Sequence, residues 1–192
     1  MNSFEILTEV INNRQSIFPS SFTREDISKE DIFKILNNAN QAPSHKHTEP
    51  WRFHIVSGTA KEKFSEFAQK SYKNYVSADK FKQSKFDKLA RKIKMSSHVI
   101  MIGCKHDVEV NLPQWEEVAA VSCAVQNIYL SATAAGFGGY WSSPGFIIAN
   151  ANKYFKMEED EVCLGLFYIG IPKDILPPQV VKRDLVDKVK WY

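Results

Sequence analysis

The sequence predicts an α+β fold, built as one domain over residues 1–192. Helical and strand-like patterns follow one another in the order α, α, β, α, α, β, α, β, α, β, so helices outnumber strands and no regular βαβ alternation occurs. The middle of residues 113–135, VAAVSCAVQNIYLSATAA, carries no charge, which is typical of a central core helix. The run EVCLGLFYIGI at residues 161–171 is apolar nearly throughout and predicts a strand that is buried on both faces.

The first half of the chain predicts two helices, a strand, two further helices and a second strand, at residues 3–13, 28–41, 51–57, 60–75, 78–96 and 98–104. The first helix has one apolar face, formed by Phe4, Leu7, Val10 and Ile11. Ser3 is a candidate N-cap for that helix, and Ser28, with Asp31 shortly after it, is a candidate N-cap for the second. Gly58 ends the first strand.

The second half predicts the long helix, a strand, a short helix and the last strand, at residues 113–135, 138–143, 145–156 and 161–171. Pro113 opens the long helix, and Gly136 closes it at the C-cap position. A tail, residues 172–192, follows the last strand.

The positive charge of the chain is concentrated in residues 61–94. The whole chain has a formal net charge of +3, yet this segment holds eleven Lys and Arg against four acids, which makes it +7 and leaves −4 for the rest. Such a stretch suggests a module that binds nucleic acid or an anionic membrane. Because the segment has no nucleic-acid-binding motif and its aromatic residues have core-like spacing, we expect neither partner.

Other features exclude several classes of protein. No run approaches the roughly 18 apolar residues of a transmembrane helix, and the first residues include acids and no leading basic region, unlike a signal peptide. The chain has three cysteines, Cys104, Cys123 and Cys163. Because their number is odd and they are far apart in the sequence, they do not form a disulfide framework, and we expect buried, reduced thiols in a cytoplasmic protein. No GxGxxG follows a predicted strand and no GxxxxGK[ST] occurs, which argues against a Rossmann dinucleotide site and a P-loop.

Two candidate binding groups are basic, and each also has a purely structural interpretation. Arg14, Gln15 and Ser16 follow the first helix. The arginine and the hydroxyl can grip a phosphate or a planar polar ring, or Arg14 simply complements the helix dipole. Lys182 and Arg183, in the tail, either remain solvated or reach back to a phosphate.

A third group lies in the loop and strand start at residues 42–53, APSHKHTEPWRF. His45, His47 and Glu49 alternate, so in an extended segment they share one face. Two histidines and a carboxylate can ligate a metal. A solvated loop and the wall of a small-ligand pocket are the other interpretations.

The fourth group is GGYWSSPG, residues 138–145. Its small residues let a ligand approach the backbone closely. Trp141 offers an aromatic wall, and Ser142 and Ser143 offer hydroxyls and amides. The structural alternative is a tight turn around a core tryptophan.

Together, these elements resemble the nitroreductase-like flavoproteins, over about residues 4–191. The resemblance lies in their order along the chain: Arg-Gln-Ser, then APS and PWRF, then Tyr-Trp-Ser-Ser after a long apolar helix, then LGLFYIGIPK before a basic pair. The specific parts are APS-x-x-x-x-x-PW-x-F and the YIGIP end. The short length is similar to that of the compact single-domain members.

The resemblance implies a sandwich with a mainly antiparallel central sheet, which forms an intertwined homodimer with two FMN sites at its interface. It implies an oxidoreductase that takes a hydride from NADH or NADPH and passes it through FMN to nitroaromatic, quinone or similar electron-poor acceptors. The alternative is a non-catalytic flavin-binding or flavin-sequestering protein of the same fold. Residues 61–96 then form a basic helical excursion beside the active site, and the tail, 172–192, reaches FMN or the partner subunit.

The family's motifs also imply roles for residues: Arg14, Gln15 and Ser16 at the FMN phosphate and ring edge, Trp141, Ser142 and Ser143 along the isoalloxazine, and Lys182 and Arg183 at the phosphate. His45 and Glu49 come from the partner subunit. Gln15 stands where Arg or His is common, and Glu49 where Gln is common. Because an ionised carboxylate cannot donate to the flavin, Glu49 is left with a backbone amide or a cation such as Lys46 or Arg52 as its partner. Neither a metal nor a catalytic side chain is implied, since the flavin carries the chemistry.

Overall fold

The computed structural model describes residues 1–174 and 182–192, and within them the fold is built on one antiparallel sheet. The strands are β1 (Trp51–Ser57), β2 (His98–Lys105), β3 (Gly138–Ser142) and β4 (Glu161–Gly170), in the spatial order β1-β2-β4-β3. All three neighbouring pairs are antiparallel. The two apolar strands of the sequence, β2 and β4, are thus the central ones, which confirms the predicted α+β class and its antiparallel sheet.

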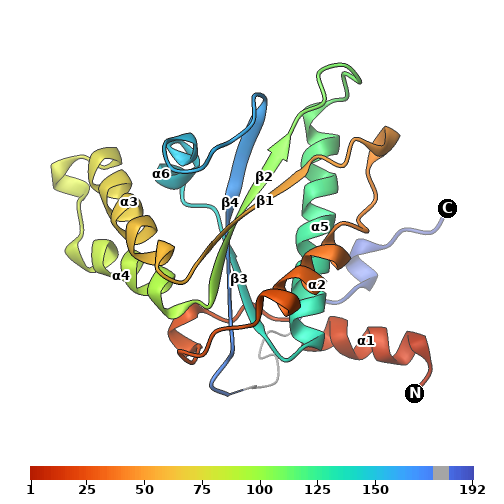
Figure 1. The fold of residues 1–192 in the computed structure, drawn as a ribbon. Helices are drawn as coiled ribbons and strands as arrows, with labels where there is room; N and C mark the ends of the chain where they lie inside the picture. The colour runs from red at the N-terminus through yellow and green to blue at the C-terminus, as the bar shows by residue number, and fades with distance from the viewer. Residues whose placement is uncertain (175–181) are drawn as a thin grey trace.

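Helices cover both faces of the sheet (Figure 1). The helices α2 (Lys29–Ala39) and α5 (Gln114–Ala134) lie on one face, while α3 (Ala60–Tyr75), α4 (Gln83–Met95) and the short α6 (Gly145–Ile148) lie on the other. Alternate residues of the central strands serve the two layers: Ile100 and Phe167 pack with α5, whereas Met101 and Leu166 face the opposite cluster. The two cores therefore share one sheet.

The predicted range of the first helix, 3–13, is confirmed, but its predicted N-cap and two other predicted helix ranges are wrong, each because a polar group takes over the backbone. Asn2, not Ser3, caps α1 (Ser3–Asn13): its side chain accepts from the Glu5 N–H at 3.0 Å, and the Glu5 carboxylate accepts from the Asn2 N–H. The helix expected from residue 78 starts only at Gln83, because Lys82 is extended and its N–H donates to the Tyr72 hydroxyl.

The helix expected at residues 145–156 is also interrupted. It consists of α6 and a separate 3-10 turn, Ala151–Lys153. Between them Asn150 leaves helical geometry, and its side-chain amide donates to the Phe146 carbonyl at 2.9 Å. A side chain that competes for a helical carbonyl in this way favours the end of a helix.

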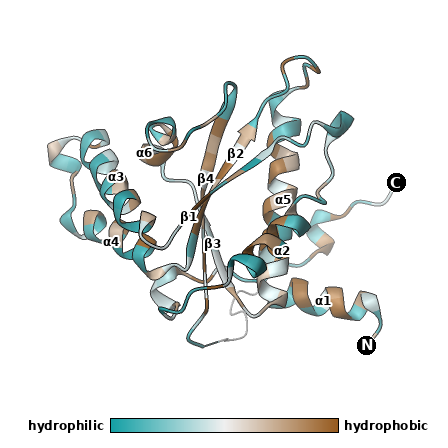
Figure 2. Cartoon of the chain, in the orientation of Figure 1, coloured by the Kyte–Doolittle hydropathy of each residue, from teal (hydrophilic) through white to brown (hydrophobic). Residues whose placement is uncertain are grey.

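Two helices present apolar faces to solvent. The helix α1 has no buried residue, and Phe4 is 77% exposed; Figure 2 shows its hydrophobic residues on a helix at the margin of the molecule. On α5, Trp115 is 70% exposed and Cys123 is exposed as well. The prediction that α5 is buried all round is therefore wrong for a single chain, as is the prediction that all three thiols are buried. None of the described helices is long and apolar enough to cross a membrane.

Gly165 lets the end of β3 lie close against β4. The β2–β4 register shifts between Ile102 and Gly103, and Gly165, opposite Ile102, has a φ of 125°. A Cβ at this position would lie 2.4 Å from the carbonyl oxygen of Ser142. Only glycine combines this backbone conformation with so close an approach, so Gly165 helps to place Ser142 and the residues that follow it.

We expect Gly165→Ala to lower the free energy of unfolding by about 2–4 kcal/mol, because it adds backbone strain and a clash with a neighbouring backbone oxygen. Gly58→Ala is the matched control: its φ is also positive, 53°, but a Cβ there would meet no heavy atom within 4 Å. Its cost should be about 1 kcal/mol. Urea unfolding of both variants measures the difference, and equal costs would contradict the close approach.

Candidate functional site

The free edge of β3 brings two of the predicted groups together. Arg14 is the C-cap residue of α1, and the chain then runs beside β3: Ser16 forms a parallel bridge with Gly139, and the Ile17 N–H donates to the Gly139 carbonyl at 2.9 Å. Because β3 is the last strand in the sheet order, its outer edge is available for this pairing. The Arg-Gln-Ser group and the Gly-rich group, far apart in sequence, are therefore neighbours.

Tyr129 of α5 joins these two groups. Its hydroxyl accepts a hydrogen bond from the Trp141 N–H at 2.8 Å and lies 3.3 Å from the hydroxyl oxygen of Ser16. The guanidinium carbon of Arg14 is 5.2 Å from the centre of its ring. This arrangement is a cation–π contact that orients the arginine. Sequence reasoning missed Tyr129, although it is the one aromatic side chain in the uncharged stretch of α5, and its ring carries a hydroxyl.

Trp141 and Tyr140 point to opposite layers, as neighbours on a strand do. Trp141 packs against the core on the α5 side, and Tyr140 against the core on the α3 and α4 side. Within residues 1–174 and 182–192, the buried indole N–H of Trp141 has no hydrogen-bond acceptor. An unpaired buried donor costs roughly 1–3 kcal/mol, so this atom would gain from a polar ligand at the strand edge.

A cavity of about 640 Å³ opens beside the end of β3. Residues 140–146 line one side of it, and Lys85, Lys88 and Lys92 of α4 line the other. Tyr168, whose pKa burial raises above its usual range, lies at its base beside Tyr140. The predicted residues Trp141, Ser142 and Ser143 thus lie along a real cavity, and the basic segment provides its opposite wall.

The loop with His45 and Glu49 lies at the other end of α5, and it is not extended. Residues 45–47 form a 3-10 turn, and Lys46, His47 and Glu49 have φ values of 52°, 57° and 43°. Alternation along this segment therefore does not place side chains on one face. His45 Nδ1 lies 2.6 Å from the Glu116 carboxylate, and no described cluster of three His, Cys, Asp or Glu could hold a metal.

Glu49 is connected through its backbone. Its N–H donates to the Ser44 hydroxyl at 3.2 Å, and Arg52 donates to its carbonyl at 3.1 Å. Arg52, one of the two cations proposed as partners of the Glu49 carboxylate, is thus close to Glu49 but donates to its backbone carbonyl oxygen.

Within a single subunit, the loop that contains His45 and Glu49 does not lie near Tyr129. Glu116, the partner of His45, and Tyr129 are on the same helix, roughly 20 Å apart along its axis at 1.5 Å per residue. Since Arg14 and Ser16 contact Tyr129, the loop residues lie far from them within a single subunit.

Lys182 and Arg183 are exposed in the C-terminal segment. The Arg183 carbonyl accepts from Lys188 at 3.2 Å, and among the described residues no ion pair links either basic side chain to another part of the fold. The predicted tail, 172–192, includes residues 175–181, which lie outside the described part of the chain.

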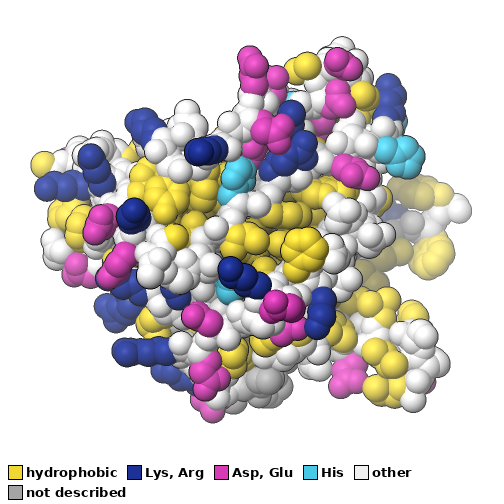
Figure 3. Space-filling view, in the orientation of Figure 1, with side chains coloured by type: hydrophobic (Ala, Val, Ile, Leu, Met, Phe, Trp, Pro, Cys, Tyr) yellow, Lys and Arg dark blue, Asp and Glu magenta, His cyan; other side chains and the backbone are white. Residues whose placement is uncertain are grey.

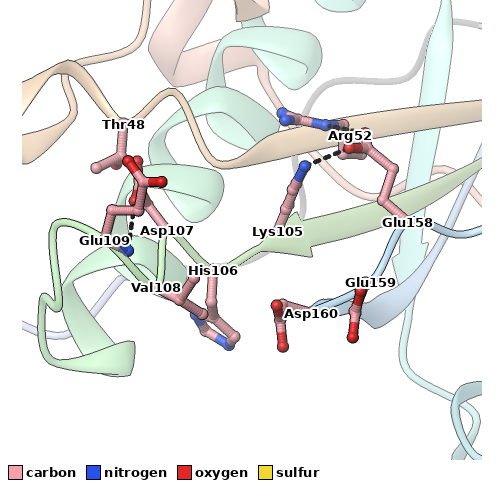
Figure 4. Close-up of a pocket in the computed structure, with 10 residues that line it drawn as sticks. All are labelled: Thr48, Arg52, Lys105, His106, Asp107, Val108, Glu109, Glu158, Glu159 and Asp160. Carbon is pink, nitrogen blue, oxygen red and sulfur yellow. Dashed lines mark hydrogen bonds and ion pairs between the residues drawn. The ribbon is translucent and has the colours of Figure 1, made fainter.

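A second cavity, also of about 640 Å³, lies at the far end of β2 and is shown in Figure 4. Its lysine and its arginine are paired with one of its acids: Glu158 accepts from Lys105 and, at 2.8 Å, from Arg52. These two hydrogen bonds lower the pKa of Glu158 to about 2. His106 is 2.6 Å from the buried carboxylate of Glu117. The pairing gives this cavity a structural role, because it ties β1, β2 and the turn before β4 together.

Comparisons with known proteins agree with this architecture. A profile of the Nitroreductase family matches residues 11–171. YdjA of Escherichia coli K12, provisionally named an NAD(P)H nitroreductase, is 28% identical over 166 residues, which cover 86% of this chain and 87% of YdjA.

Two solved structures have the same fold. A nitroreductase-like family protein from Bacillus cereus has a TM-score of 0.82 at 22% identity, covering 100% of this chain and 98% of its own. The FMN-dependent nitroreductase NfnB from Mycobacterium smegmatis, solved in complex with NADPH, has a TM-score of 0.79 at 14% identity, covering 99% and 100%. At these identities the likeness is one of fold.

We expect Tyr129→Phe to lower the free energy of unfolding by about 1–2 kcal/mol, because the Trp141 N–H loses its acceptor while the ring remains. Tyr75→Phe, at the exposed end of α3, is the control and should change the free energy by less than about 0.5 kcal/mol. Chemical denaturation measures both values. If the two variants were equally stable, the Tyr129 hydroxyl would not join α5 to β3.

Proposed function

The chain belongs to the nitroreductase family, and we propose that it is an FMN-dependent oxidoreductase that takes a hydride from NADH or NADPH. The acceptors would be nitroaromatic, quinone or similar electron-poor compounds. The observation that carries this proposal is the junction at Tyr129, where Arg14, Ser16 and Trp141 meet at the free edge of β3. NfnB, which shares the fold, is FMN-dependent and binds NADPH.

The residues at this junction fit FMN. Among the described residues Arg14 has no ion-pair partner, so its positive charge is free for a phosphate or for the electron-rich edge of a flavin. Ser16 adds a hydroxyl, and the buried Trp141 indole has an unused donor. FMN, when bound, would supply the chemistry by which two electrons are transferred from the nicotinamide to the acceptor.

The protein's own part in the reaction is binding and orientation. Arg14 is held over Tyr129 and supplies a fixed positive charge, which stabilises negative charge that develops nearby. Trp141, Ser142 and Ser143 line the cavity at the end of β3 and would define where a flat ring lies. Lys182 and Arg183 would add their charges at the phosphate, and Gln15 would lie between Arg14 and Ser16 at the ring edge. No side-chain nucleophile or general base is required.

We also propose that the protein is a homodimer, in which α5 packs against α5 of the partner. The exposed apolar surface includes Phe4 of α1, Trp115 of α5 and Trp191 of the C-terminal segment. Both termini project from the side of the molecule on which α5 lies (Figure 1). Exposed apolar surface of this kind favours association with a second copy of the chain.

A two-fold, antiparallel arrangement of α5 would also complete the site. It would place the His45 and Glu49 end of one subunit beside the Tyr129 end of the other, which a single chain separates by roughly 20 Å. Each FMN would then be held by residues of both subunits, and each dimer would have two sites.

A flavin-binding protein without turnover is the alternative for the same fold. The purified protein, incubated with FMN, desalted and titrated anaerobically with NADH and with NADPH, distinguishes the two. A yellow protein that either nucleotide bleaches, and that an electron-poor acceptor reoxidises, is the expected result. A yellow protein that neither nucleotide reduces would favour sequestration, and a protein that keeps no flavin would overturn both.

Arg14→Ala should raise the dissociation constant for FMN by roughly 10- to 100-fold, because one charge-assisted contact is lost. Arg24→Ala is the control, since Arg24 is exposed and lines a different cavity. Fluorescence titration of the apoprotein with FMN measures both affinities. An Arg14→Ala variant that binds FMN as tightly as the parent would remove Arg14 from the site.

Ala119→Arg should convert the dimer to a monomer, because it adds a charge to the exposed face of α5, one helical turn from Cys123. In the dimer the thiol of Cys123 should be protected from a disulfide reagent, and in the variant it should react. Burial raises the pKa of Cys104 and of Cys163 to about 11, so these two stay unreactive near neutral pH in both forms.

Light scattering reports the oligomeric state, and thiol titration reports Cys123. Ala78→Arg, on the exposed turn between α3 and α4, is the control and should leave both readings unchanged. A native dimer whose Cys123 reacts freely would place the interface elsewhere.

A further inference from the structure

Three lysines face the cavity at the end of β3 without any acidic partner. Lys85, Lys88 and Lys92 all come from α4 and line that cavity, and no acid does. Among the described residues none of them is in an ion pair, and residues 175–181 contain no acid. Figure 3 shows Lys and Arg side chains gathered over α3 and α4. The charge of these three lysines therefore has no acidic partner in the part of the chain that the structure describes.

Aromatic rings hold two of these amines in place. The ammonium of Lys92 lies 5.0 Å from the centre of the Tyr140 ring. That of Lys85 lies 5.1 Å from the Tyr72 ring and 5.9 Å from the Phe146 ring. Cations over aromatic faces keep their charge while they lose freedom, so the amines are positioned rather than merely solvated.

Aromatic side chains form much of the remaining walls. Tyr75, Tyr140 and Phe146 line the cavity together with the backbone of residues 142–145. Asp87, the acid on α4, accepts a hydrogen bond from Gln83 at 2.9 Å and does not line the cavity. The cavity therefore offers a surface for a planar ring on one side and positive charge on the other.

We infer that this cavity is a binding site for the anionic group of a planar aromatic ligand, a carboxylate or a phosphate held by Lys85, Lys88 and Lys92. The inference rests on the proposed function, because the ligand is then one of the two molecules that react at the flavin. Either the electron acceptor is an aromatic carboxylate, or the phosphates of NAD(P)H occupy the lysines. Both sources have the same chemistry, and kinetics separates them.

The test replaces all three lysines with glutamine, Lys85→Gln, Lys88→Gln and Lys92→Gln. The matched control is Lys63→Gln, Lys70→Gln and Lys73→Gln, three exposed lysines of α3 that do not line the cavity. Both variants lose the same charge from the same segment, so a general electrostatic attraction of anions would affect them equally. The KM values for 4-nitrobenzoate, its neutral analogue 4-nitrobenzamide, NADH and NADPH are measured on the FMN-loaded enzymes.

The cavity variant should raise KM for an anionic ligand about tenfold and leave KM for 4-nitrobenzamide within about twofold. A rise for 4-nitrobenzoate alone identifies the acceptor as the anion, and a rise for the nucleotides alone identifies the donor; both results support the site. Equal changes in the cavity and control variants, or no change in either, would overturn it.

Calorimetric titration of the FMN-loaded protein with benzoate and with benzamide gives a second reading that does not depend on turnover. Benzoate should bind more tightly than benzamide to the parent, and the preference should disappear in the cavity variant only. If NADH and NADPH do not reduce the FMN-loaded protein, or if the protein retains no flavin, the proposed function fails. A benzoate titration of the protein as purified then still tests the lysine site. If the parent protein is yellow and reducible but binds benzoate no more tightly than benzamide, the lysine site alone is overturned.

Discussion

The hydrogen bond from the Trp141 N–H to the Tyr129 hydroxyl is the interaction on which the candidate site depends. It ties the longest helix to the edge strand, and the same tyrosine carries Arg14 on its ring and Ser16 at its hydroxyl. Three segments of the chain, each unremarkable alone, are thereby held at one place. A buried tyrosine suits this role because its body packs in the core while its hydroxyl remains available to polar groups.

The edge of the sheet determines what this junction can do. Because β3 has a neighbour on one side only, its other side is open to the segment after α1 and, beyond it, to a cavity. Gly165 allows the end of β3 to lie flush with β4, so that residues 142–145 face that cavity. The strand edge, often a liability in β-structure, is here partly paired with the segment after α1, through Ser16 and Ile17.

The chain also has two kinds of exposed surface that a binding partner or a ligand would stabilise. The apolar residues of α1 and of one face of α5 are exposed. The three cavity lysines of α4, Lys85, Lys88 and Lys92, and Arg14 lack acidic partners among the described residues. Apolar surface gains free energy when a second apolar surface covers it, and positioned cations gain it from an anion. A second subunit would cover the apolar surface, and small anionic molecules would pair with the cations.

The sequence by itself determined the order and type of the main elements and the α+β class, because these follow from local periodicity and from the apolar runs of β2 and β4. It also singled out Arg14, Ser16 and Trp141, although not the residue that joins them. The tertiary structure alone decided that Tyr129 is that residue, that α5 keeps an exposed face, that the turn of residues 45–47 breaks the expected alternation, and that lysines of α4 face β3. These properties depend on contacts between segments far apart in the chain, which local patterns do not encode; periodicity predicts that a helix has faces, but only packing determines what each face meets.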